Sequence, residues 1–168
     1  HAKDMVFNFV LKKNITSYII VFTIFLIDRF SKYIILKLSQ PFGELNISVT
    51  SFLNFQLIWN NGIAFGLFSF EQDLYYNLFT LLIISITSII IWLSYKAKGL
   101  EKISYLMIIG GSLGNIFDRI FYSSVPDFID ISYKGYHWFI FNVADIFISL
   151  GIICLIFFEI LNNKKNEK

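Results

Sequence analysis

Residues 110–145, GGSLGNIFDRIFYSSVPDFIDISYKGYHWFIFNVAD, decide how the chain is organised. They lie between and inside segments that are otherwise strongly apolar, and they contain one arginine and four carboxylates. The carboxylates are Asp118, Asp127, Asp130 and Asp145. An ionisable side chain at membrane depth costs roughly 2.5–3.5 kcal/mol on insertion scales. Four carboxylates in such surroundings therefore need a reason, and the hypothesis is catalysis by a pair of aspartates.

The composition indicates one integral membrane unit. Of the 168 residues, 56% are hydrophobic and only 15% are charged, whereas soluble domains carry about 25% charged residues. The net charge of +2 predicts no nucleic-acid partner. The single cysteine, Cys154, excludes an internal disulfide and a metal site built from thiolates alone. Residues 1–4 precede Met5 and are interpreted as an expression scar, which leaves residues 5–168 as a single domain.

Four apolar segments predict a membrane all-α bundle of four transmembrane helices with a small extracytoplasmic β-domain. Each segment has about 20 residues or more, enough for a helix to cross a ~30 Å hydrocarbon core. The predicted helices cover about 15–38, 74–95, 103–122 and 139–161. The β-domain is expected at about 41–70, because a Pro-Phe-Gly turn at 41–43 precedes alternating apolar and polar residues.

Lysines set the expected orientation. They flank the first helix at its start, fill the connection between the second and third helices, and end the chain, whereas residues 39–73 contain neither Lys nor Arg. Because basic residues concentrate on the cytoplasmic side, both termini are expected to be cytoplasmic. Residues 39–73 and 123–138 should then face the outside.

The third predicted helix has one small and polar side. Gly110-x-x-x-Gly114 lets another helix approach closely. Asn115 and Arg119 lie one turn apart and could reach a common partner. Two readings stay open for this pair: a polar clamp between helices, or an Arg119 that orders a catalytic or substrate-binding loop.

Asp127 and Asp145 can meet near the outer face. Asn142 and Asp145 share one face of the fourth predicted helix, with Asp145 about six residues inside it, and Asp127 follows the third helix on the same side. A close pair would share one proton and could activate water against a peptide bond; alternatively, it could bind a cation or relay protons. Asp130 and Asp118 are rivals to Asp127, although the neighbouring Arg119 favours ion pairing for Asp118.

Two further polar clusters have a structural and a functional reading. Asp28 and Lys32, at i and i+4, favour a salt bridge within the first helix, or they contact substrate or a lipid headgroup. Asn60-Asn61-Gly62 has two interpretations: it forms a turn, as the Asn-Gly pair indicates, or one of its asparagines binds a peptide backbone. His137 is read as ordinary polar surface in a loop, and no histidine supports a metal site.

Five blocks in order across the chain resemble lipoprotein signal peptidase, also called signal peptidase II, the bacterial intramembrane aspartyl protease family. Each block alone would be weak, but five in the right order are specific. They are Asp28-Arg29-Phe30-Ser31-Lys32, Asn60-Asn61-Gly62-Ile63-Ala64-Phe65, Gly114-Asn115-Ile116-Phe117-Asp118-Arg119, Val125-Pro126-Asp127-Phe128-Ile129-Asp130 and Phe141-Asn142-Val143-Ala144-Asp145.

The resemblance implies an aspartic endopeptidase whose catalytic pair is Asp127 and Asp145. It implies removal of the signal peptide from diacylglyceryl-modified prolipoproteins, by cleavage before the lipidated cysteine, with no metal or cofactor. The expected partners are these substrates and membrane lipids, and the expected state is a monomer. The expected location is the bacterial cytoplasmic (inner) membrane, with the active site near the outer face. The residues implied to order the site or bind substrate are Asn60, Gly62, Asn115, Arg119 and Asn142, with Asp28 and Lys32 from the first-helix block.

Two positions depart from the family pattern. Pro126 stands where an aliphatic residue is common and should bias Val125 towards extended backbone. Arg29 stands where an uncharged polar residue is frequent. Two other functions remain as alternatives from the residues alone: an ion-coupled transporter or channel that uses intramembrane carboxylates, and a non-enzymatic membrane scaffold.

Overall fold

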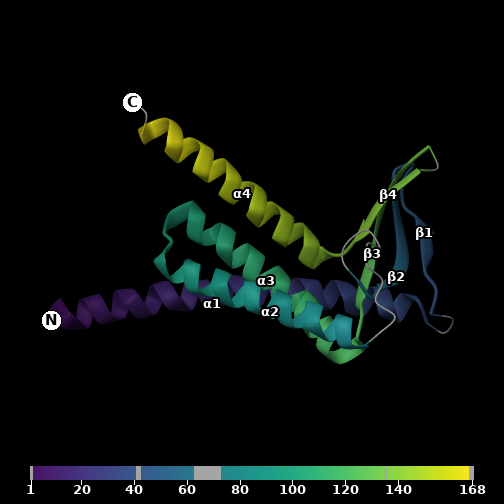
Figure 1. Ribbon diagram of the computed structural model, residues 1–168, viewed down its shortest axis with the longest axis horizontal. Coiled ribbons are helices and arrows are strands. Elements are labelled where there is room, and N and C mark those ends of the chain that lie inside the picture. Colours follow the sequence, from purple (N-terminus) through teal and green to yellow (C-terminus); the bar gives the residue numbers. More distant parts are fainter. Residues whose placement is uncertain (1, 41–42, 63–72, 135, 167–168) are drawn as a thin grey trace.

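The computed structural model describes residues 2–40, 43–62, 73–134 and 136–166. It contains four helices, and a small antiparallel sheet lies at one end of them (Figure 1). The helices are α1 (Ala2–Leu38), α2 (Asp73–Lys96), α3 (Gly99–Tyr122) and α4 (Val143–Asn166). The predicted combination of four helices and a small sheet is therefore confirmed.

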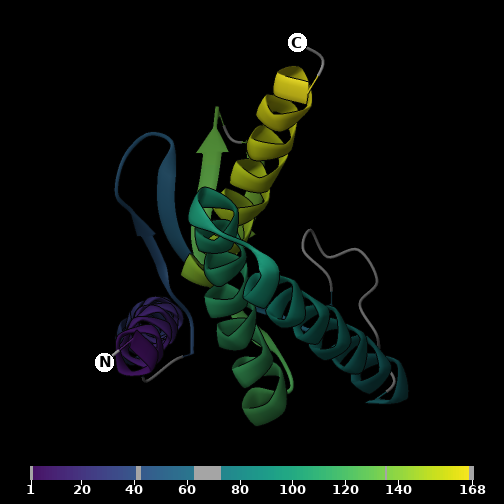
Figure 2. The ribbon, with the colours of Figure 1, turned by 90° about the vertical axis from the view of Figure 1, so that its left-hand side faces the viewer.

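Helix α3 lies at the centre of the bundle. It contacts α1, α2 and α4, and Figure 2 shows it surrounded by these three helices. Glycines make this close packing possible. A Cβ atom on Gly110 would lie 2.8 Å from Ile24 Cβ of α1, and one on Gly111 would lie 2.5 Å from the Ala144 carbonyl oxygen of α4. The small face predicted for this helix thus allows two neighbours to approach its backbone.

The sheet has the strand order β1-β2-β3-β4, with every neighbouring pair antiparallel. Its strands are β1 (Asn46–Ser48), β2 (Leu53–Asn60), β3 (Val125–Tyr133) and β4 (Tyr136–Phe141). A small buried cluster joins the C-terminal end of α1 to the sheet through Ile35, Leu45 and Phe128. The sheet therefore stands at the opposite end of the bundle from both chain termini (Figure 1).

Helix α4 begins at Val143, four residues later than the predicted start at 139. The residues before it, YHWFIF, form β4 and pair with β3. Aromatic and β-branched side chains favour strands, and Asn142 is a favourable residue immediately before a helix. The third connection thus supplies two strands of the sheet, which the β-region expected at about 41–70 did not include. Residues 63–70 of that region lie outside the described residues.

The other three helices, in contrast, begin earlier than expected. Helix α3 begins at Gly99 rather than at about 103, and α1 begins at Ala2, so it includes residues interpreted as a scar. Within the described part of the chain, two helical segments are long and apolar enough to cross a membrane, Leu74–Lys96 and Val143–Asn162. Helices α1 and α3 carry more charge. Their charged side chains Asp28, Lys32, Asp118 and Arg119 are buried in the bundle, so four crossings stay a prediction.

Candidate active site

The first turn of α4 fixes the position of Asp145. The Asp145 backbone N–H donates to Asn142 Oδ1 (3.2 Å), and the Asn142 backbone N–H donates to Asp145 Oδ2 (3.1 Å). This is the reciprocal arrangement of a capping box, with Asp in place of the usual Glu. Asp145 therefore lies in the first helical turn and not six residues inside the helix. The aligned peptide dipoles at the N-terminus of a helix favour a negative charge there.

Asn142 connects Asp145 to Asp127. Its side-chain oxygen is occupied by the helix cap, so its side-chain nitrogen must face the other way, where it donates to Asp127 Oδ1 (2.6 Å). Asn142 has no exposed surface. A single buried amide thus holds a carboxylate of β3 beside the start of α4.

Asp127 and Asp145 line one cavity of about 540 Å³ between β4 and the first turns of α4. The other walls are almost entirely apolar. They are Phe139, Ile140, Phe141, Ile146, Ile148, Ser149 and Leu150. The two carboxylates therefore face the same space, a meeting that their spacing in the sequence allowed but did not establish.

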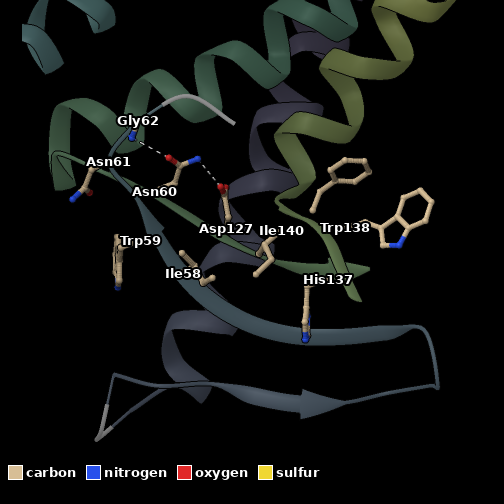
Figure 3. Close-up of a pocket in the computed structure, with 10 residues that line it drawn as sticks. Ile58, Trp59, Asn60, Asn61, Gly62, Asp127, His137, Trp138 and Ile140 are labelled. Carbon is tan, nitrogen blue, oxygen red and sulfur yellow. Dashed lines mark hydrogen bonds between the residues drawn. The ribbon is translucent and has the colours of Figure 1, made fainter. Parts of the chain in front are cut away.

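A second cavity, of about 460 Å³, extends from Asp127 across the strands (Figure 3). Asp127 is shared by both cavities, as are two residues of β4, Phe139 and Ile140. An extended ligand could therefore pass Asp127 with one part over the sheet and another part against α4.

The surroundings of Asp127 favour its protonated form. Burial raises the pKa of the Asp127 carboxyl from 3.8 to about 6, and the negative charge of Asp145 raises it as well. Hydrogen bonds from Asn60 and Asn142 and the charge of Lys32 act in the opposite direction on that pKa. A carboxyl with a pKa near 6 can hold or release a proton close to neutral pH.

A chain of hydrogen bonds connects Asp127 to Arg119. Asn60 Nδ2 donates to Asp127 Oδ2 (2.9 Å), and the Gly62 backbone N–H donates to Asn60 Oδ1 (2.9 Å), as the dashed lines of Figure 3 show. Arg119 Nη2 then donates to the Gly62 carbonyl oxygen (2.7 Å). The turn predicted at 60–62 is therefore also a support for Asp127, and Arg119 orders that turn.

The guanidinium of Arg119 carries further donors beside the one that binds Gly62. Its Nε and Nη1 atoms are buried and have no hydrogen-bond partner among the described residues. Its guanidinium lies over the rings of Tyr76 (5.4 Å) and Phe79 (5.1 Å), which keeps water from one side of it. Buried donors without partners are costly, and a ligand carbonyl would satisfy them.

Behind Asp145 lies a cluster of four charged side chains, of which Asp28, Lys32 and Asp118 are buried and Arg29 is partly exposed. Lys32 Nζ lies 3.0 Å from the Asp28 carboxylate, as the i,i+4 spacing predicted, and 2.6 Å from Asp118. Arg29 binds Asp118 through both terminal nitrogens, at 2.5 and 2.8 Å. Asp118 is therefore ion-paired as expected, but with Arg29 and Lys32 of α1 and not with its neighbour Arg119.

The cluster contacts the first turn of α4 in two places, one directly and one through Asn115. Asp28 Oδ1 accepts from the Ala144 backbone N–H (3.0 Å), so a carboxylate of α1 caps α4. Asn115 accepts from Lys32 Nζ (3.1 Å) and donates to Asp145 Oδ1 (2.8 Å). Among the described residues, Asn115 and Arg119 share no hydrogen-bond partner: Asn115 binds Lys32 and Asp145, and Arg119 binds the Gly62 carbonyl oxygen.

Asp130, the rival to Asp127, lies elsewhere. It is fully buried, its Oδ2 accepts from Asn54 Nδ2 (3.0 Å) and lies 2.8 Å from His137 Nδ1, and it lines neither cavity. His137 lies in β4 and not in a loop. Sequence reasoning missed the contributions of Arg29, Asn54 and His137, because only strand register and helix contacts bring them to their partners.

The chain is similar to known proteins over most of its length. A family model described as "Signal peptidase (SPase) II" matches residues 20–161. The chain is similar to the "Lipoprotein signal peptidase" of Pelagibacter ubique (strain HTCC1062), 48% identical over 160 residues that cover 94% of this chain and 96% of that protein. It is also similar to that of Wigglesworthia glossinidia brevipalpis, 44% identical over 146 residues covering 84% and 92%.

A solved structure shares the fold. It is described as "Bacterial membrane enzyme structure by the in meso method at 2.3 A resolution", and it is 30% identical with a TM-score of 0.76. The match covers 91% of this chain and 92% of that one.

Proposed function

The chain belongs to the signal peptidase II family, and we propose that it removes signal peptides from diacylglyceryl-modified prolipoproteins with Asp127 and Asp145 as the catalytic pair. Cleavage falls before the lipidated cysteine. The enzyme crosses the bacterial cytoplasmic membrane four times, with the active site near the outer face. One observation carries the proposal: the two carboxylates line a single cavity and are bridged by Asn142.

The two aspartates have different roles in the proposed reaction. Asp145 accepts hydrogen bonds from Asn115 and from the Asn142 backbone and lies at a helix N-terminus, which suits an ionised base. Asp127, with its raised pKa, suits the protonated partner. The pair is thereby prepared with one proton between its two carboxyl groups.

Water then adds to the scissile carbonyl. The water oxygen bonds to the carbonyl carbon while Asp145 takes a proton from that water. At the same time Asp127 gives its proton to the carbonyl oxygen. In the second step the intermediate's C–N bond breaks, the amine nitrogen takes the proton held by Asp145, and a hydroxyl proton returns to Asp127. No covalent bond to the enzyme forms, and the pair ends with the one proton it began with.

The surrounding residues suit such a substrate. The cavity beside α4 is walled by apolar side chains, which fits a lipid-modified cysteine. The spare donors of Arg119 fit peptide carbonyl oxygens near the Asn60–Gly62 turn. In this proposal Asp28 and Lys32 act indirectly, by holding the first turn of α4 and Asn115.

Cleavage of a purified lipid-modified preprolipoprotein tests the proposal. We expect the parent enzyme to cleave it, and we expect Asp127→Asn and Asp145→Asn each to lose activity by a factor of about 10³ or more, since each removes one proton-transfer group. The matched control is Glu159→Gln, which makes the same change at an exposed position of α4, about 21 Å further along the helix.

Two results would refute the proposal. Full activity in either Asn variant would remove that residue from the reaction. Ion flux through reconstituted protein without any cleavage would favour the transporter hypothesis instead.

A further inference from the structure

A buried carboxylate orients a half-exposed imidazole at the edge of the sheet. Asp130 has no exposed surface, whereas 54% of the His137 side chain is exposed, and their Oδ2 and Nδ1 atoms are 2.8 Å apart. Burying a carboxylate is costly unless it is paired. Joining β3 to β4 alone would not need a charge, because backbone hydrogen bonds already pair these strands.

The contacts of Asp130 determine which nitrogen of His137 carries the proton. Asn54 Nδ2 donates to the same Oδ2 atom (3.0 Å) and also to Ser132 Oγ (2.8 Å), which fixes the Asn54 amide. Asp130 Oδ2 is therefore an acceptor, and His137 Nδ1 must be a donor to it. In the neutral imidazole the other nitrogen, Nε2, then has a free lone pair.

Nε2 has no hydrogen-bond partner within the described part of the chain, and His137 lines the same cavity as Asp127 and Asn60. Figure 3 draws His137 at the opposite end of this cavity from Gly62. The floor between them includes Ile58 of β2 and Ile140 of β4. A peptide in extended form over this floor would present backbone N–H groups along its length.

We propose that His137 is a substrate-binding residue, positioned by Asp130, whose Nε2 accepts a hydrogen bond from a backbone N–H of the extended prolipoprotein segment. This inference rests on the proposed function and adds a contact at the end of the cavity away from the Asn60–Gly62 turn. Because the contact is remote from the reacting bond, it contributes to binding and leaves the chemical step unchanged.

Steady-state cleavage by three variants tests this role. His137→Ala should raise KM for the lipid-modified substrate about tenfold, the loss of one hydrogen bond, with kcat unchanged. His137→Gln places an amide where Nε2 lies and should keep KM near the parent value. His137→Asn places its amide where Nδ1 lies, so it can keep the Asp130 contact but should raise KM as Ala does.

The outcomes separate the two possible roles of the histidine. If Asn restores the parent KM and Gln does not, or if His137→Ala leaves KM unchanged, the residue only joins strands and the inference fails while the proposed function stands. If the parent itself does not cleave, the proposed function fails. Binding of the same lipopeptide to the three variants then decides whether His137 contacts it.

Discussion

At the scale of single residues, the distinctive property of the site is that the Asp127 carboxyl keeps its proton to a higher pH than an ordinary aspartate does. Its pKa is raised from 3.8 to about 6. If protonated Asp127 donates to the scissile carbonyl, kcat/KM should fall as the pH rises through about 6 in the free enzyme. Asn60→Ala removes a hydrogen bond that stabilises the charged form, so it should move this limb to higher pH. A pH profile for parent and variant measures the shift, and a limb that stays in place or moves to lower pH contradicts the assignment.

The same carboxyl should reduce stability at neutral pH. Between pH 3.8 and about 6 the folded protein binds more protons at Asp127 than the unfolded chain does, so the free energy of unfolding falls as the pH rises through this window. Above this pH window the free energy of unfolding stays lower by a constant amount of roughly 3 kcal/mol, since one pKa unit corresponds to about 1.4 kcal/mol. Asp127→Asn should therefore be more stable than the parent at pH 8 and no more stable at pH 4. Unfolding in detergent micelles measures both, and equal stability at pH 8 would exclude this cost.

At the scale of elements, the start of α4 depends on residues from other elements. Its first N–H groups are capped by Asn142 and by Asp28 of α1, and Asp28 also neutralises Lys32 and Arg29. Asp28→Ala should therefore destabilise the protein by about 3–5 kcal/mol, because it leaves an unbalanced buried cation as well as an uncapped N–H.

A double variant separates these two contributions. Arg29→Gln in the Asp28→Ala background restores the charge balance of the cluster, with Lys32 facing Asp118, and should recover part of the lost free energy of unfolding. The remaining deficit, about 1 kcal/mol, is the lost cap. If the two substitutions add instead of compensating, the charge balance of the cluster does not matter.

These elements also show which features the sequence could predict. Apolar length predicts helices, and the i,i+4 spacing of Asp28 and Lys32 predicts their salt bridge, because both signals are local. The strand at 136–141 was missed because its aromatic residues are as apolar as a helix start, and only pairing with β3 distinguishes the two. The partners of Asp118 could not be predicted either, since the packing of α1 on α3 selects Arg29 and Lys32 over the adjacent Arg119.

At the scale of the whole molecule, the connection at 96–102 is rich in lysine, whereas residues 43–62 contain neither Lys nor Arg, and the two segments lie at opposite ends of the bundle. Figure 1 places the sheet at one end of the bundle, while both termini and the α2–α3 connection lie at the other. The lysine-rich connection at 96–102 is at the end with the termini, and residues 43–62, which contain neither Lys nor Arg, are at the sheet end. Helices of 24 residues such as α2, α3 and α4 are about 36 Å long, which is enough for the ~30 Å core of a bilayer. Among the described helices, α2 and α4 are also apolar enough to cross it.

Single cysteines test this orientation. In a Cys154→Ser background, Ser51→Cys lies in an exposed turn of the sheet end and Lys98→Cys lies at the exposed α2–α3 connection. Because basic connections stay on the cytoplasmic side, a membrane-impermeant maleimide should label position 51 in intact spheroplasts and position 98 only after lysis. The two sites serve as controls for each other, because both must react once the membrane is opened. Labelling of position 98 before lysis, or protection of position 51, would reverse the orientation. The proposed active site would then face the cytoplasm.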